Sequence, residues 1–162
     1  MNATPLQRSL MARGAILFFI GLLTGMWAGA VMTEGRAMFL TLPKPHFERL
    51  ALVAHLNALL GCFWIVAVAV TLEATRFGEK GKTWLARGVT VVCYGNWLIT
   101  LIASFLDVRG LEMLEKDPKN NFIAVILLVV VVFPGLATAG AWAWGLLGKP
   151  APSRVEGTER AP

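Results

Sequence analysis

One histidine lies inside an apolar stretch that is long enough to cross a membrane. His55 stands within residues 50–62, which are otherwise almost entirely apolar. An ionisable side chain at this depth is costly unless it has a partner, so it is a candidate functional residue by default. Imidazole is also the commonest metal ligand in proteins, which makes His55 our candidate metal ligand.

A stripe of polar residues follows further along the chain. Its members recur every three or four residues and therefore share one face of an α-helix: Cys93, Asn96, Thr100, Ser104 and Asp107. In a membrane helix such a stripe must face protein or a cavity. It either bonds neighbouring helices, at about 1 kcal/mol per hydrogen bond, or it lines a substrate pocket. If the helices over 50–72 and 84–106 are antiparallel, Thr100 and His55 lie at the same depth, which favours a pocket.

The two polar side chains within residues 50–62 face different directions. Asn57 is two residues beyond His55, which is about 200° around a helix. If Asn57 faces the polar stripe inside one subunit, His55 faces outward, and we expect a cofactor held between subunits. Ala58, Leu59 and Cys62 share the side of His55. Their modest bulk is expected to leave room for a large flat ligand, so they are candidate cofactor contacts.

The composition indicates that these residues belong to a membrane protein. The chain has 162 residues, is 56% hydrophobic, and carries only 15 Lys and Arg and 10 Asp and Glu, too few charges for a soluble globule of this size. Four apolar runs approach or exceed the ~20 residues of a spanning helix: about 15–32, 50–72, 84–106 and 122–147. None alternates like a strand. The sequence predicts an all-α, polytopic membrane protein, a bundle of four transmembrane helices in one domain, residues 1–148.

The charged residues lie mostly outside the apolar runs, and their imbalance predicts the orientation. The two tails and the loop after residue 72 hold the larger share of the basic residues: Arg8, Arg13, Arg76, Lys80, Lys82, Arg87, Lys149, Arg154 and Arg160. By the positive-inside rule both termini are cytoplasmic, with residues 149–162 a disordered tail. The net charge of +5 then reflects residues that flank membrane helices, and no nucleic-acid partner is expected.

The first apolar run has an alternative interpretation as a secretory signal. Basic residues precede it, and small residues at 28–30 resemble a cleavage site. However, Gly21, Gly25 and Gly29 line one helix face, and such a face lets a neighbouring helix approach closely. A signal peptide has no use for that face, so we expect this helix to be retained.

Two further features bear on the helices. Pro134 and Gly135 are expected to kink the helix over 122–147, because they free backbone groups there. The tryptophans divide by depth: Trp84, Trp142 and Trp144 stand near helix ends as interfacial anchors. The deeper ones could pack on an aromatic ligand: Trp27, Trp64 and Trp97.

At these residues the chain resembles the hydroxylaminobenzene mutase family. The resemblance is carried by residues 13–25, by Ala54-His55-Leu56 and by Tyr94-Gly95-Asn96-Trp97, within about residues 10–148. It implies a small four-helix protein of the bacterial inner membrane that converts a hydroxylaminoarene to an aminophenol. More distantly, the layout is similar to that of styrene oxide isomerases, which are trimers that hold ferric haem b between subunits through a histidine of the second helix.

The resemblance implies haem b on His55 and a small aromatic substrate. A ferric haem with one protein ligand keeps an open position and can polarise a substrate oxygen as a Lewis acid. Asn96 and Tyr94 would orient the substrate, and Asn57 and Thr100 complete our set of candidate catalytic residues. The chain departs from both families at Gly61, where they have an asparagine. A different pocket implies a different substrate or a different outcome, so an aryl epoxide remains a second candidate substrate.

Two other classes of function stay open. A haem-binding electron-transfer subunit normally needs a second axial ligand, and only Met26 or Met113 is at hand. A structural subunit without a cofactor would use His55 as a hydrogen-bonded core residue. An absorption spectrum of the purified protein discriminates among the three classes.

Overall fold

The described part of the chain is entirely helical apart from its turns. The computed structural model describes residues 3–33, 48–106, 108 and 117–147. Its helices are α1 (Pro5–Met32), α2 (Glu48–Thr71), the short 3₁₀ turn η1 (Leu72–Ala74), α3 (Glu79–Phe105), α4 (Pro118–Leu127), the π-helical turn η2 (Leu128–Val132) and α5 (Phe133–Leu147). Four stretches are long and apolar enough to span a membrane, the last comprising α4, η2 and α5. The expected all-α protein with four membrane helices is confirmed.

The helices extend beyond the apolar runs, and at α1 and α4 a polar cap marks the start. α1 begins at Pro5, well before residue 15. The Thr4 hydroxyl accepts a hydrogen bond from the Gln7 backbone N–H at 3.3 Å, and the Gln7 side chain accepts one from the Thr4 N–H at 2.9 Å. This capping box satisfies two otherwise unpaired donors. Asp117 caps α4 by accepting from the Asn120 N–H at 2.9 Å.

The last membrane helix changes its hydrogen-bonding pattern in the middle. We expected a kink at Pro134 and Gly135; what the structure has is a π-helical turn, η2, which ends two residues before Pro134. Proline has no N–H to offer the preceding turn, and a π turn is one way to absorb that loss. Gly95 of α3 faces this segment, where an added Cβ would lie 3.0 Å from Cγ1 of Val130.

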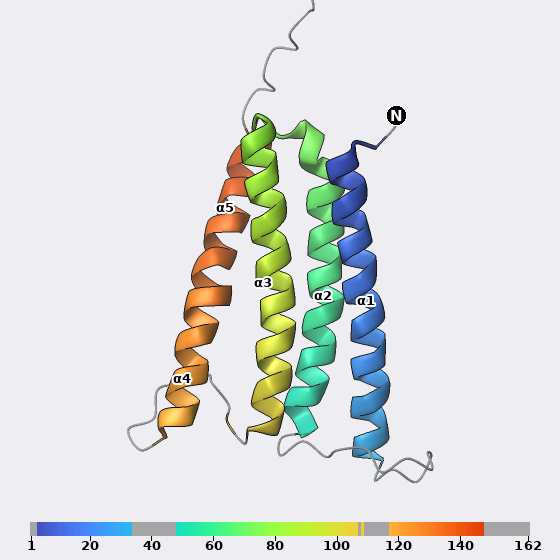
Figure 1. The fold of residues 1–162 in the computed structure, drawn as a ribbon, viewed down its shortest axis with the longest axis vertical. Coiled ribbons are helices and arrows are strands. Elements are labelled where there is room, and N and C mark those ends of the chain that lie inside the picture. The colour runs from blue at the N-terminus through green and yellow to red at the C-terminus, as the bar shows by residue number, and fades with distance from the viewer. Residues whose placement is uncertain (1–2, 34–47, 107, 109–116, 148–162) are drawn as a thin grey trace, which may run out of the picture.

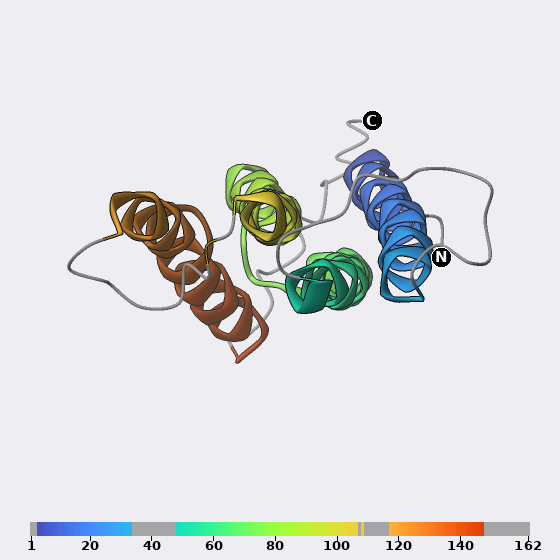
Figure 2. The same cartoon turned by 90° about the horizontal axis from the view of Figure 1, so that it is seen from below.

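The helices form a group of three with the fourth at its side. α1, α2 and α3 share a core that includes Leu17, Ile65 and Val89, whereas the α4–α5 helix packs mainly on α3 (Figures 1 and 2). Large apolar side chains face outward on several helices; Phe19 is 61% and Leu60 67% exposed. Apolar exposure on this scale suits contact with lipid and not with water.

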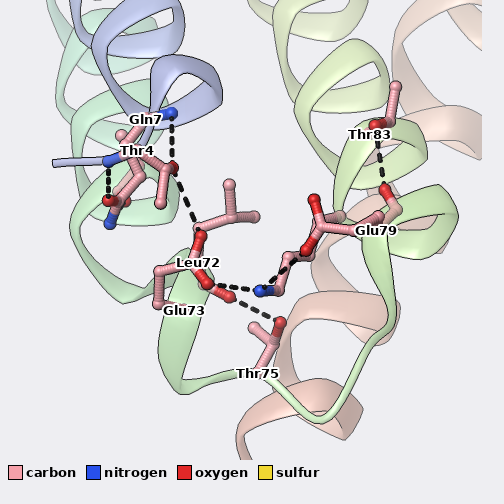
Figure 3. A network of polar contacts seen from close by, with 9 residues as sticks. Thr4, Gln7, Leu72, Glu73, Thr75, Glu79 and Thr83 are labelled. Atoms are coloured by element: carbon pink, nitrogen blue, oxygen red, sulfur yellow. Dashed lines mark hydrogen bonds and ion pairs between the residues drawn. The ribbon is translucent and has the colours of Figure 1, made fainter. Parts of the chain in front are cut away.

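Polar contacts tie the helices together at the end that carries the N-terminus. Lys82 of α3 forms an ion pair with Glu73 and a second, at 3.4 Å, with Glu79. The Thr4 hydroxyl donates to Glu73 at 3.3 Å (Figure 3). The starts of α1 and α3 are thereby joined to η1, the turn that follows α2.

The C-terminal end of α5 is joined to the same region. The Trp142 indole N–H donates to the Thr71 hydroxyl at 2.9 Å, and the Arg76 guanidinium lies 3.9 Å from the centre of the Trp144 ring. Both tryptophans lie near the helix end, as expected of interfacial anchors. Other residues named above lie outside the described residues: Asp107, Met113 and 149–162.

Candidate functional site

His55 lies against the glycine face of α1. Its Nδ1 is 2.7 Å from the carbonyl oxygen of Gly21. A Cβ added at Gly25 would lie 2.5 Å from the same nitrogen, so only glycine leaves room for the ring at that position. The expected close approach at Gly21 and Gly25 is confirmed, whereas an added Cβ at Gly29 would meet no atom of the described residues within 4 Å.

The contact with Gly21 determines which ring nitrogen of His55 remains available. A carbonyl oxygen only accepts hydrogen bonds, so Nδ1 carries the hydrogen. In the neutral ring Nε2 then presents its lone pair. Histidines that bind metals characteristically donate their other ring N–H to a carbonyl or carboxylate in this way, which orients the ring and sets its tautomer. The ring is half-buried.

Asn57 faces the opposite neighbour of α2. Its side-chain NH₂ donates to the Thr100 hydroxyl of α3 at 3.0 Å, and that hydroxyl donates to the carbonyl oxygen of Asn96 at 2.7 Å. Thr100 is buried. The expected divergence of His55 and Asn57 is confirmed, and the Asn57–Thr100 bond places the stripe at the level of His55. The expected outward direction of His55 is wrong for the single chain, because the ring turns onto α1, where Gly21 and Gly25 leave room for it. Asn57 and Thr100 bond α2 to α3, so each has a structural role whatever else it does.

The other two candidate catalytic residues lie in different places on α3. Asn96 is half-buried, and within the described residues its side-chain amide forms no hydrogen bond. Tyr94 reaches α1, where its hydroxyl donates to the carbonyl oxygen of Arg13 at 2.8 Å. Arg13 precedes Gly21 by eight residues, roughly 12 Å along the helix. Tyr94 therefore lies away from His55 of the same subunit. Asn96 is the residue of the stripe whose side-chain amide has no hydrogen bond to the described residues.

The space expected beside His55 on α2 is largely filled by the chain itself. Ala58 is fully buried, and a Cβ added at Gly21 would lie 2.9 Å from its methyl group. Cys62 is also buried within the α1–α2–α3 core. Leu59 is half-buried next to Gly21. Of the three expected ligand contacts, only Leu59 keeps an appreciable exposed surface in the single chain, because α1 packs where we expected open space.

Trp97 of α3 holds α1 through a hydrogen bond next to the contact between His55 and Gly25. Its indole N–H donates to the Thr24 hydroxyl at 3.1 Å, and Thr24 precedes Gly25 directly. Trp97 also lines a shallow groove of about 330 Å³ between α1 and α3. Trp27 and Phe105 lie in the same groove, stacked with ring centroids 5.2 Å apart. Trp64 instead packs against the core. Two of the three deep tryptophans thus line an aromatic groove.

The partners Gly21, Thr24 and Gly25 were not identified as site residues from the sequence. The spacing of the glycines predicted a close helix contact but not which residue would fill it. Thr24 carried no signal, since a single threonine in a membrane helix commonly bonds its own backbone, as Thr24 also does to Ile20 at 2.9 Å.

The residues present suit a metal group that needs one protein ligand. In the described part of the chain, no three His, Cys, Asp or Glu side chains are grouped so as to hold a bare metal ion. A haem brings four ligands of its own and requires only an axial one. An imidazole with an oriented ring and an available Nε2 fits that requirement.

Comparison with known proteins gives two matches. The family model for styrene oxide isomerase matches residues 6–147. A hydroxylaminobenzene mutase, HabB of Ectopseudomonas oleovorans, is 28% identical over 166 residues, covering 98% of this chain and 92% of that protein. No solved structure matches the chain. The resemblance inferred from the motifs around residues 13–25, His55 and Asn96 is confirmed.

Proposed function

The chain belongs to the styrene oxide isomerase family and is an intramolecular isomerase of the membrane; we propose that it rearranges an aryl hydroxylamine to an aminophenol with haem b on His55. In this reaction the N–O bond breaks and a C–O bond to the ring forms, so substrate and product have the same mass. An aryl epoxide that rearranges to a carbonyl compound is the second candidate substrate, since the matching family is named after styrene oxide, which is an aryl epoxide.

The observation that carries the proposal is the hydrogen bond from His55 Nδ1 to the Gly21 carbonyl oxygen. It holds the ring against α1 and leaves Nε2 as the one available donor atom of this side chain. When bound there, a ferric haem would supply Lewis-acid polarisation of the substrate oxygen. Gly25 has no side chain and therefore leaves room for the His55 ring.

Asn96 is the residue we propose to orient the substrate. Its amide offers both a donor and an acceptor at the level of the membrane where His55 lies, and within the described residues neither is used. Thr100 and Asn57 position Asn96 indirectly. The Thr100 hydroxyl donates to the backbone carbonyl oxygen of Asn96 and accepts a hydrogen bond from Asn57. The hydroxyl of Tyr94 is bonded to α1, so we assign Tyr94 the role of holding α3 to α1.

The membrane setting suits the proposed substrate. Arenes partition into lipid, and the aromatic groove between α1 and α3 is open at the lipid-facing surface. We propose that the protein lies in the bacterial inner membrane with both termini in the cytoplasm, on the strength of the basic residues at that end. We also propose a homotrimer that shares the haem between subunits, as the resemblance implies; the half-buried ring of His55 leaves part of the imidazole accessible from outside the single chain.

The decisive experiment combines a spectrum with a mass balance. The detergent-purified protein is expected to show a Soret band of high-spin ferric haem. Offered hydroxylaminobenzene or an aryl epoxide without dioxygen, NAD(P)H or reductant, it is expected to form a product of unchanged mass. A low-spin spectrum with turnover that requires a reductant would favour electron transfer, with Met26 as the second ligand. A colourless protein inactive on both substrates would favour a structural subunit.

The oligomeric state is tested separately by native mass spectrometry. We expect a trimer whose haem is lost when the trimer dissociates. Haem that remains on a monomer would contradict a position between subunits without affecting the isomerase assignment.

A further inference from the structure

Two basic side chains on one face of α3 have no acidic partner in the part of the protein that the structure describes. Lys80 and Arg87 are exposed and lie seven residues apart, with Trp84 between them at 72% exposure. Within residues 3–33, 48–106, 108 and 117–147, neither forms an ion pair. Lys82, on another face of the same helix, is buried and paired with Glu73 and Glu79. Lys80 and Arg87 are therefore available to bind an external anion, whereas Lys82 is not.

The depth of Arg87 favours contact with an external anion. It lies roughly 12 Å into the helix from Glu79, within a helix that spans the membrane. A guanidinium near the hydrocarbon is stable only if it reaches an anion or water at the surface. Lys80 and Arg87 line one pocket of about 290 Å³ together with Glu79, Thr83 and Trp84. Glu79 shares its charge with Lys82 at 3.4 Å, so the pocket keeps a net positive charge.

An apolar crevice adjoins this pocket. It lies between α3 and α5, has a volume of about 500 Å³, and is also lined by Trp84. Small residues on both helices leave it open: Gly81, Gly88, Ala137 and Ala141. α3 and α5 lie beside each other in both views (Figures 1 and 2). The Trp84 ring is thus a shared wall between a cationic pocket and an apolar crevice.

We propose that this pair of cavities binds one anionic phospholipid. Lys80 and Arg87 hold the headgroup phosphate, Trp84 lies at the level of the glycerol, and one acyl chain occupies the crevice between α3 and α5. Charge complementarity selects the headgroup, because a zwitterionic lipid brings a second, positive charge into a pocket that is already positive. The inference is independent of the proposed reaction, since none of these residues belongs to the candidate catalytic site.

The test measures retained lipid on the intact protein. Protein in mild detergent is exchanged with phosphatidylglycerol or with phosphatidylcholine of the same acyl chains, and adducts are counted by native mass spectrometry. We expect retention of phosphatidylglycerol only. Lys80→Gln combined with Arg87→Gln is expected to weaken it about tenfold or more. Arg8→Gln with Arg13→Gln, an equal loss of charge on α1, is the matched control and is expected to change little.

A second pair of variants tests the crevice without altering charge. Ala137→Phe fills the crevice and is expected to reduce retention, whereas Ala139→Phe, exposed on the same helix outside it, is the control. Equal retention of both lipids, or full retention by the Lys80/Arg87 variant, would overturn the proposal. So would an equal thermal stabilisation by inorganic phosphate alone, or a cross-link showing a second copy of the chain over Trp84.

Discussion

The carbonyl oxygen of Gly21 accepts a hydrogen bond from Nδ1 of His55 at 2.7 Å, across the contact between α1 and α2. Both residues lie in helices that span the membrane. The bond removes one of the two polar groups of a costly intramembrane imidazole from contact with lipid. It leaves the other nitrogen for a ligand, so the stability of the helix pair and the chemistry of the site depend on the same contact.

Replacement of His55 with alanine is expected to remove the bound haem and keep the fold. The variant loses the proposed axial ligand, while α2 becomes more apolar and inserts at least as well. The measurement is the ratio of Soret to protein absorbance after purification, with membrane insertion checked by carbonate extraction. Unchanged haem content would show that another residue is the ligand.

Gly25→Ala is expected to disturb the site more than an alanine elsewhere on the same helix face. The new Cβ would lie 2.5 Å from His55 Nδ1 and 2.6 Å from Cε1, so the ring must move off the Gly21 carbonyl. Haem content should fall several-fold. The matched control is Gly29→Ala, which meets no atom of the described residues within 4 Å and should behave like the wild type. Equal haem content in both variants would contradict the role assigned to Gly25 in making room for the His55 ring.

Asn96→Ala and Thr100→Val separate orientation of the substrate from helix packing. Asn96→Ala should lower kcat strongly with little change in haem content or Tm, since its side chain bonds nothing in the described residues. Thr100→Val removes the bond with Asn57, so it should cost about 1 kcal/mol of stability and reduce activity less. The reverse ranking, measured by turnover and thermal unfolding in detergent, would favour helix packing as the only role of the stripe.

Trp97→Phe is expected to loosen α1 beside the site. It removes the indole donor to Thr24, which costs about 1 kcal/mol. Trp142→Phe removes an equivalent bond to Thr71 at the far end of the helices. The two variants should therefore lose similar stability, while only Trp97→Phe alters the haem spectrum or KM. Identical kinetics in both would mean that the aromatic groove has no part in the reaction.

Much of the architecture could be predicted from the chain alone. Lipid offers no partners to backbone N–H and C=O groups, so runs of about 20 apolar residues can only be helices. The same constraint made His55 and the stripe from Cys93 to Ser104 visible, because polar groups in such helices need partners. The divergence of His55 and Asn57 followed from 3.6 residues per turn. These inferences depend on helix geometry and on the lipid surroundings, and both can be inferred from the sequence.

The identity of each partner was decided only by tertiary packing. Gly21, Gly25 and Gly29 have the same spacing, yet only the first two meet α2, because α2 lies across part of that face. The same crossing buries Ala58, which we expected beside a ligand, and the reach of Tyr94 to Arg13 carries its hydroxyl away from His55. Which residues meet depends on where two helices cross and at what depth. That position results from the sum of many side-chain contacts, which the spacing within a single helix does not contain.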